Sequence, residues 1–330
     1  MSASAQVMES KRASTGLIFA GLGALFLAVQ IYAFTSWILS PEFRATPIGT
    51  DPIPANIRSI IDHYQMINSV IGILALLWFI QGIVRTGRIG PVRLMMVGWL
   101  SAYWLDPWLD FLRPVFTYNA YAFNRGCWCS FIPFWHNPSG ARIAEPLLID
   151  PSSYFYNFTL VAVLAWLVMR WARNRRPTLS TPTLILIGFV VIWVTMSLLD
   201  IVATRYFGFD AWPIAFRRAT LWAGQSYQFP IYEFILFPTA FVASAMVLLS
   251  KKTDGSTAIE RGFERFGGAA RTTLRVLAFI GFCNLTNFLY TTAFGIHGLW
   301  ADGWPAHMPS WLADEQCGPQ TGTACTQPAP

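Results

Sequence analysis

Seven apolar stretches of about 20 residues each limit the fold of this chain more than any other feature. A helix needs about 20 apolar residues to cross a hydrocarbon core of roughly 30 Å. Only 12% of the residues are charged, against about 25% in a soluble domain. We therefore predict an all-α, polytopic membrane helix bundle that forms a single domain over residues 1–330. Its seven transmembrane helices are expected near Thr15–Leu39, Met66–Val84, Val92–Leu112, Tyr154–Trp171, Pro182–Ala203, Phe229–Leu249 and Thr273–Ile296.

The basic residues predict the orientation of this bundle. Most of them lie at the N-terminus and in short connections at 85–93, 170–176 and 251–275. The positive-inside rule then places the N-terminus in the cytoplasm and the C-terminus outside, in a plasma (inner) membrane protein. The connection 113–153 is expected to form an exoplasmic aromatic lid, and 297–330 a partly disordered exoplasmic tail. Because the net charge of +6 arises from these loops, it does not predict a nucleic-acid partner.

Four carboxylates lie inside the apolar stretches, each toward the predicted exoplasmic side: Asp106, Asp110, Asp200 and Glu233. An ionisable group at membrane depth is costly and is usually functional. Carboxyl groups that share a dry cavity repel one another, so that some hold a proton while others do not. One residue type can then supply both a general acid and a general base. We predict that these four residues are catalytic.

Each acid also has a structural interpretation. Asp106 precedes a proline and can satisfy local backbone groups, Asp110 can pair with Arg113, and Asp200 has Arg205 nearby. A third reading is a metal site, because Asp106 and Asp110 form a D-x-x-x-D pair that can hold Mg²⁺ against a diphosphate. With only one such pair in the chain, no metal and no cofactor are predicted.

The loop after the third stretch has the most distinctive local sequence, with many aromatic residues between positions 118 and 138. Its density of rings predicts a loop folded over the bundle or an aromatic belt at the membrane interface. The expected substrate-binding residues here are Asn124, Trp128, His136 and Glu145. One His beside the C-x-C pair at 127–129 is weak evidence for zinc.

The remaining cysteines and the last apolar stretch give two further expectations. Cys317 and Cys325 can close a small loop by a disulfide in an oxidising compartment. Pairing of these tail cysteines with position 127 or 129 is the alternative, since sequence does not fix connectivity. In the last stretch, Asn287 and Tyr290 share a helix face and are expected to hold substrate oxygens, unless they serve helix packing.

Three short segments resemble the AveC-like spirocyclases, a membrane protein family typified by the spiroketal-forming cyclase of avermectin biosynthesis. They are the Asp-Pro pair at 106–107, the run Asn-Arg-Gly-Cys-Trp at 124–128 leading into Phe-Ile-Pro at 131–133, and Glu-Pro-Leu-Leu at 145–148. The resemblance implies spiroketal formation, in which two hydroxyls add to one ketone with loss of water. It does not imply a particular substrate.

The resemblance and the acids together predict an acid/base cyclase or dehydratase for a lipophilic hydroxyketone or polyketide-like substrate. We expect Asp106 to be the acid and Glu233 or Asp200 the base. Alternatives are a membrane terpene cyclase and a non-enzymatic, proton-coupled lipid transporter or lipid-binding protein. The predicted partners are the lipophilic substrate and membrane lipid. Tryptophans are expected to shape the pocket and to face a cation, namely Trp104, Trp108 and Trp128.

Overall fold

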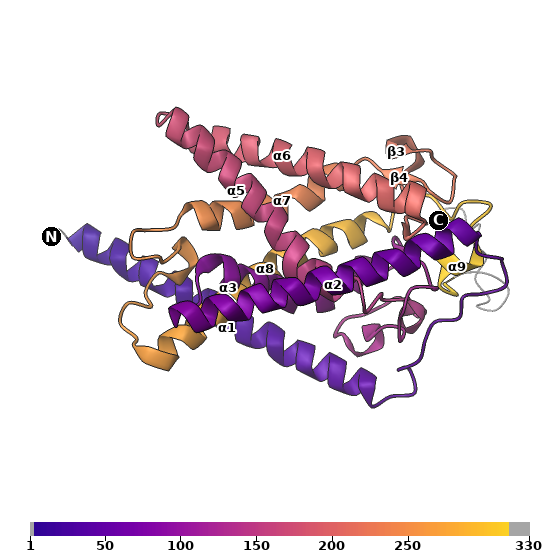
Figure 1. Cartoon of the computed structure of the whole chain (residues 1–330), viewed down its shortest axis with the longest axis horizontal. Coiled ribbons are helices and arrows are strands. Elements are labelled where there is room, and N and C mark those ends of the chain that lie inside the picture. The colour runs from indigo at the N-terminus through magenta and orange to yellow at the C-terminus, as the bar shows by residue number, and fades with distance from the viewer. Residues whose placement is uncertain (1–2, 317–330) are drawn as a thin grey trace.

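The computed structural model describes residues 3–316. Most of its long helices run roughly along one axis, α5 crosses this axis obliquely, and successive helices run in opposite directions (Figure 1). They are α1 (Ala3–Ile38), α2 (Ala55–Thr86), α3 (Pro91–Ala102), α5 (Phe158–Arg175), α6 (Thr181–Val202), α7 (Glu233–Leu249) and α8 (Gly268–His297). Short helical segments are α4 (Asp150–Ser152), α9 (Ser310–Ala313), the π-helices η4 (Ser153–Asn157) and η5 (Ala203–Phe207), and the 3₁₀ helices η1 (Tyr103–Asp110), η2 (Cys129–Phe131), η3 (Gly140–Arg142), η6 (Arg217–Ala219) and η7 (Ala258–Glu260).

Five helical segments are long and apolar enough to cross a membrane: Thr15–Ile38, Ala55–Thr86, Asp150–Arg175, Thr181–Phe207 and Gly268–His297. The predicted membrane helix bundle is therefore supported, whereas the count of seven spans and the orientation stay predictions. The sixth stretch forms α7, which is apolar but has 17 residues. The third stretch is not one α-helix, because it continues from α3 into η1, which contains Pro107. A proline removes one backbone hydrogen bond and clashes with the preceding turn of an α-helix.

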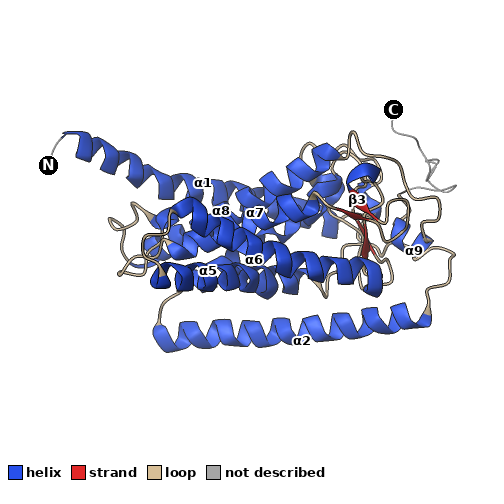
Figure 2. Ribbon diagram, turned by 90° about the horizontal axis from the view of Figure 1, so that it is seen from above, coloured by secondary structure: helices blue, strands red, loops and turns tan. Residues whose placement is uncertain are grey.

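Segments far apart in the sequence form a folded cap at one end of the bundle, around the short strands and α9 (Figure 2). Strand β1 (Thr117–Tyr118) pairs antiparallel with β2 (Asp210–Ala211), and β3 (Thr220–Leu221) with β4 (Phe229–Pro230). The chain after α8 joins them, since Thr117 Oγ1 donates to the carbonyl of Leu312 over 2.7 Å. The predicted lid loop and the described part of the tail are thus both built into this cap.

Helix α8 lies at the centre of the bundle and packs against α1, α3 and α7. Helix α2 lies apart from the other long helices for much of its length (Figure 2). It is fastened by polar contacts, among them the Tyr156 hydroxyl, which donates to Asn68 Oδ1 over 2.7 Å. Near its other end, Arg93 Nε donates to the carbonyl of Phe79 over 3.2 Å. The central helices and the cap therefore form the frame that holds the site described next.

Candidate functional site

A cavity of about 130 Å³ lies where η1, η4, α6, α7 and α8 meet the cap. Five carboxyl groups line it, and none of the described residues in its wall is Lys, Arg or His. The rest of the wall is largely aromatic. The lining acids are Asp106, Asp150, Asp200, Asp210 and Glu233, and the lining rings belong to Tyr64, Phe116, Tyr118, Tyr154, Phe158, Phe209, Trp212, Phe237 and Tyr290.

Three of the four acids singled out in the sequence share this cavity, namely Asp106, Asp200 and Glu233. Tyr290 joins them, and Asp110 is not in the wall. In an α-helix, residues four positions apart lie on one face. A 3₁₀ helix has three residues per turn, so positions i and i+4 point about 120° apart. Because η1 is a 3₁₀ helix, Asp110 turns away from Asp106.

Asp106 receives one tyrosine hydroxyl on each carboxyl oxygen. Tyr154 Oη donates to Oδ1 over 2.6 Å, and Tyr118 Oη donates to Oδ2 over 2.7 Å. Tyr154 comes from η4 and Tyr118 from the cap strand β1, so the bundle and the cap both position this carboxylate. Hydrogen bonds to both oxygens stabilise the charged form of a carboxyl group. Asp106 is therefore equipped to carry a negative charge in the cavity.

Glu233 stands at the start of α7 with a different set of partners. Its Oε1 accepts a 2.8 Å hydrogen bond from Tyr290 Oη. Its Oε2 is buried and has no hydrogen-bond partner among the described residues. A proton on Oε2 is thus free to be given to a molecule in the cavity. Asp200 is half-buried in the wall, and its carboxyl group accepts no hydrogen bond from the described protein, so its carboxyl oxygens are available to accept a proton.

Asp210 is a lining acid of the cap. It lies in β2, and its Oδ1 accepts a hydrogen bond from Thr204 Oγ1. Burial raises the pKa of Asp210 from 3.8 to about 7, although the bond from Thr204 opposes this shift. An acid with a raised pKa binds more protons in the folded than in the unfolded chain, so folding stability falls as the pH rises. The fall spans the interval from about pH 4 to about pH 7.

Asp210→Asn is expected to flatten the pH dependence of stability. The amide oxygen can still accept from Thr204, while the charge that disfavours folding above pH 7 is removed. The ionised wild-type group costs roughly 4 kcal/mol at pH 8. Thermal unfolding in detergent between pH 5 and pH 8 checks this. The variant should gain more stability over the wild type at pH 8 than at pH 5, where about a third of the effect is present. An unchanged slope would contradict the assignment.

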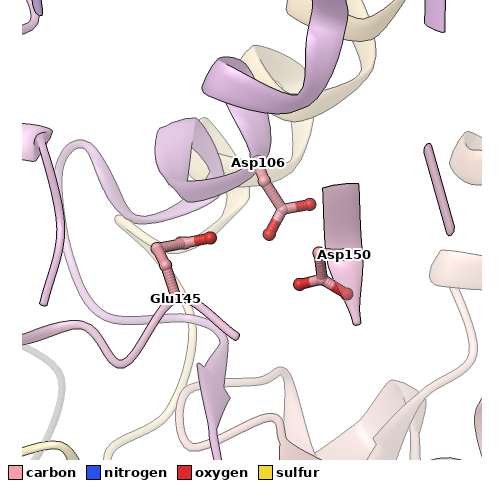
Figure 3. Close-up of side chains that lie close together, drawn as sticks. All are labelled: Asp106, Glu145 and Asp150. Carbon is pink, nitrogen blue, oxygen red and sulfur yellow. The ribbon is translucent and has the colours of Figure 1, made fainter. Parts of the chain in front are cut away.

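A second group of acids lies at the cavity wall. Asp106, Glu145 and Asp150 each direct an oxygen into one space, and these three oxygens lie within 4.8 Å of one another (Figure 3). Glu145 is fully buried, and neither of its carboxyl oxygens has a hydrogen-bond partner among the described residues. Burial raises the pKa of Glu145 well above its ordinary range, and the nearby charges of Asp106 and Asp150 raise it further. Among residues 3–316, these three have the geometry to hold a metal ion.

The structure gives Asp110 a structural role, whereas it does not give Asp200 the ion pair that the sequence allowed. Asp110 Oδ1 accepts from the backbone N–H of Val115 over 2.7 Å and of Phe116 over 2.9 Å. The guanidinium of Arg113 instead donates to the carbonyl of Gly298. Arg205 does not pair with Asp200, because its guanidinium lies 4.2 Å from the ring centroid of Trp222. Asp110 therefore holds the start of the cap, and Asp200 faces the cavity without a basic partner.

The three tryptophans expected to face a cation do not line the cavity. Trp104 Nε1 donates to Asn284 Oδ1 over 2.7 Å, and Trp108 Nε1 donates to Thr292 Oγ1 over 2.9 Å. Trp128 is fully buried, and its Nε1 donates to the backbone carbonyl of Trp104 over 2.8 Å. Each ring thus packs η1 or the cap against the helices, and other rings form the wall of the cavity.

The remaining expected binding residues hold the framework or face solvent. Asn124 Oδ1 accepts from the backbone N–H of Thr46 over 2.8 Å, which ties two loops together. Asn287 is buried and its Nδ2 donates to the carbonyl of Ala102 over 3.2 Å. His136 is exposed on the cap. None of the three lines the cavity.

The cysteines next to this loop are joined to each other. A disulfide links Cys127 and Cys129, which accounts for both thiols of the C-x-C pair. The alternative pairing of either cysteine with the tail is therefore not what the structure shows, and the pair is not free to hold zinc. Cys317 and Cys325 lie outside the described residues, so their disulfide stays a prediction.

Sequence reasoning missed two of the five lining acids and the role of a third residue. Asp150 lies immediately before the fourth apolar stretch, and Asp210 stands in a long connection. The signal that could have found Asp210 is its position within an aromatic run, Phe207–Trp212, at the same end as the other acids. Glu145 was expected to contact substrate, whereas it lies behind Asp106 and Asp150 rather than in the cavity wall.

The chain was compared with known protein families, curated proteins and solved structures. No curated protein matches the chain, and no solved structure does. One family model matches residues 54–315, which include all five lining acids, Glu145 and most of the cap. That model describes the spirocyclase AveC-like proteins. Since the match covers well over half of the chain, the chain belongs to the AveC-like spirocyclase family.

Proposed function

We propose that this protein is a membrane-embedded cyclase that joins a hydroxyl to a ketone-derived carbon of a lipophilic hydroxyketone with loss of water. One observation carries the proposal: five carboxyl groups and a ring of aromatic side chains line one cavity without a basic residue among the described lining. Acids of this kind supply and accept protons. Aromatic faces and a carboxylate stabilise a cation that forms between the two proton transfers.

The proposed reaction starts from the hemiketal form of the substrate. Glu233 gives the proton on Oε2 to the hemiketal hydroxyl, the carbon–oxygen bond breaks, and water leaves. The resulting oxocarbenium ion is stabilised by the Asp106 carboxylate, whose charge is held by Tyr118 and Tyr154. A second hydroxyl of the substrate attacks the carbon, and its proton passes to Asp200. Return of that proton to Glu233 completes the cycle, with one water lost.

In the proposed reaction Glu233 takes the acid role that the sequence suggested for Asp106, Asp106 stabilises the cation, and Asp200 is the base. The sequence suggested Asp106 as the acid. Its two tyrosine donors favour the ionised carboxylate, whereas Glu233 has one free oxygen from which a proton can be donated. The oxocarbenium ion needs a fixed negative charge beside it, and preorganised charge is the larger part of such stabilisation. Asp106 fits that task better than proton donation.

The volume of the cavity limits which part of a substrate reacts there. A cavity of about 130 Å³ is close in size to the roughly 150 Å³ cavity that holds one benzene molecule. Only the ring-forming portion of a long hydroxyketone therefore fits between the acids. We propose that the rest of the chain extends from the cavity toward lipid.

Incubation of purified protein with dihydroxyketones of increasing chain length tests the function. The expected result is a product lighter by one water, formed with control of the new stereocentre. Absence of product together with substrate-dependent proton flux in liposomes would overturn the proposal in favour of a proton-coupled transporter. Conversion of an isoprenoid instead of a hydroxyketone would favour a terpene cyclase.

A further inference from the structure

We propose that Asp106, Glu145 and Asp150 bind one divalent cation of the class that prefers oxygen ligands, such as Mg²⁺, Mn²⁺ or Ca²⁺. The three residues come from η1, from the loop before α4 and from the start of α4. Their side chains point into one space in Figure 3. The cluster lies against the cavity but extends behind its wall, through Glu145.

The spacing of the oxygens fits one ion. One carboxyl oxygen from each residue lies within 4.8 Å of the other two. Oxygen ligands lie about 2.0–2.6 Å from Mg²⁺ or Ca²⁺. Two ligands of one ion are therefore separated by roughly 3 Å when adjacent and by no more than about 5 Å when opposite. The three oxygens can thus be bound by a single ion with small movements of the side chains.

Glu145 provides an independent reason to expect a ligand. Its side chain is fully buried and aimed into the cluster, yet neither oxygen has a hydrogen-bond partner among the described residues. Asp150 Oδ2 is likewise buried without a described partner. An unpaired buried charge costs several kcal/mol. A cation placed between these oxygens would satisfy all of them at once.

The charges around the cluster favour a cation over an internal salt bridge. The charged groups that act most strongly on Glu145 are Asp106, Asp150, Asp110 and Asp314, all of them acidic. Neither of the two ion pairs in the described residues, Arg142–Glu315 and Arg275–Glu260, reaches this place. A divalent ion would reduce the formal charge of the three carboxylates from −3 to −1.

The ligand set and its surroundings select a hard cation. All three donors are carboxylate oxygens, with no thiolate or imidazole, which suits Mg²⁺, Mn²⁺ or Ca²⁺ better than zinc. Asp106 keeps lone pairs for a metal, because each of its oxygens accepts only one tyrosine hydroxyl. Such outer-shell hydrogen bonds orient metal-binding carboxylates. The two tyrosines would therefore orient Asp106 toward the ion and also stabilise its negative charge.

The proposed ion site does not depend on the proposed cyclase function, but the site shares residues with the cavity. Asp106 and Asp150 belong to both the cluster and the cavity wall, whereas Glu145 belongs to the cluster alone. If the proposed function holds, the cluster with its ion would keep a formal charge of −1 and could still stabilise the oxocarbenium ion, while the ion would hold Asp106 in place.

Manganese titration of the full-length protein in detergent tests the site without any substrate. Protein stripped with EDTA is titrated with Mn²⁺, and electron paramagnetic resonance of the free ion gives the bound fraction. One high-affinity ion per chain is expected, displaced by Mg²⁺ or Ca²⁺, together with a higher unfolding temperature of the wild type. Glu145→Gln should weaken binding at least about tenfold.

Asp110→Asn is the matched control, because it neutralises a buried acid of η1 that is not part of the cluster. It should weaken Mn²⁺ binding much less than Glu145→Gln does, because it removes a nearby charge but no metal ligand. Wild-type protein that neither binds Mn²⁺ nor gains thermal stability with millimolar Mg²⁺, Mn²⁺ or Ca²⁺ would overturn the site and show that the carboxyls share protons instead. A folded Glu145→Gln variant with wild-type affinity would also overturn it. Neither result bears on product formation, which is measured separately.

Discussion

Glu233→Gln is expected to lower the turnover number of ring closure by a factor of about 10²–10⁴, the usual contribution of a general acid. The glutamine amide is nearly isosteric, and its oxygen can still accept the hydrogen bond from Tyr290 Oη. What is lost is the acidic proton on Oε2. Because substrate contacts stay in place, kcat should fall and KM should change little. Initial rates of product formation measured by mass spectrometry check both quantities.

The control for this variant is Asp110→Asn, which makes the same kind of change at a buried acid outside the cavity. Its amide oxygen can still accept from the backbone N–H groups of Val115 and Phe116. Its turnover should stay within about twofold of the wild type, since in the proposed reaction the catalytic proton comes from Glu233 and not from Asp110. Equal losses in both variants would mean that neutralising any buried acid disturbs the fold. Full turnover of a folded Glu233→Gln protein would exclude Glu233 as the acid.

The convergence of Asp106, Asp200 and Glu233 was predictable because it follows from strong forces. Each acid lies near the same end of an apolar stretch, and a charge in that position is too costly to face lipid. Alternating helices bring these ends together, and burial away from lipid then directs the side chains inward. Five of the seven predicted stretches correspond to helices long and apolar enough to cross a membrane, and they could be recognised because such a helix has to match the thickness of the bilayer.

The parts of the site that the sequence did not predict depend on contacts between distant segments and on the local type of helix. Asp210 reaches the cavity because its strand β2 pairs with β1, which lies about 90 positions earlier in the chain. Strands of two residues carry no sequence pattern that predicts this pairing. Asp150 belongs to a helical turn that precedes the apolar stretch. Asp110 is not in the cavity wall because its segment forms a 3₁₀ helix, in which Asp106 and Asp110 point about 120° apart.

The positions of the tryptophans were also not predictable from the sequence. An aromatic ring next to a candidate acid can either line a cavity or fill the core, and composition does not separate the two. Trp104 packs against Phe26 and Trp128 packs edge-on against Phe34, both rings of α1. The indole Nε1 of Trp128 also donates to the backbone carbonyl of Trp104. Which rings face the cavity is decided by where the cap closes on the bundle.

The second large effect is expected where α1 crosses α8. A Cβ added to Gly23 would lie 2.0 Å from the carbonyl oxygen of Leu277, and one added to Gly281 would lie 2.0 Å from the carbonyl oxygen of Phe19. Both obstacles are backbone atoms, so no side chain can rotate away. Small residues allow such close approach of membrane helices, where packing supplies much of the association energy.

Gly23→Leu should therefore push α1 from α8 and destabilise the protein by roughly 3 kcal/mol or more, lowering the unfolding temperature by roughly 4 °C or more. Gly21→Leu is the matched control, because Gly21 is exposed on the same helix and a Cβ there meets nothing within 4 Å. Both changes add the same apolar side chain, so any difference in thermal unfolding in detergent reports the crossing alone. Equal unfolding temperatures for the two variants would contradict the packing. Since α8 also carries Tyr290, which donates to Glu233, a displaced α8 should lose cyclase activity before it loses its helical circular dichroism signal.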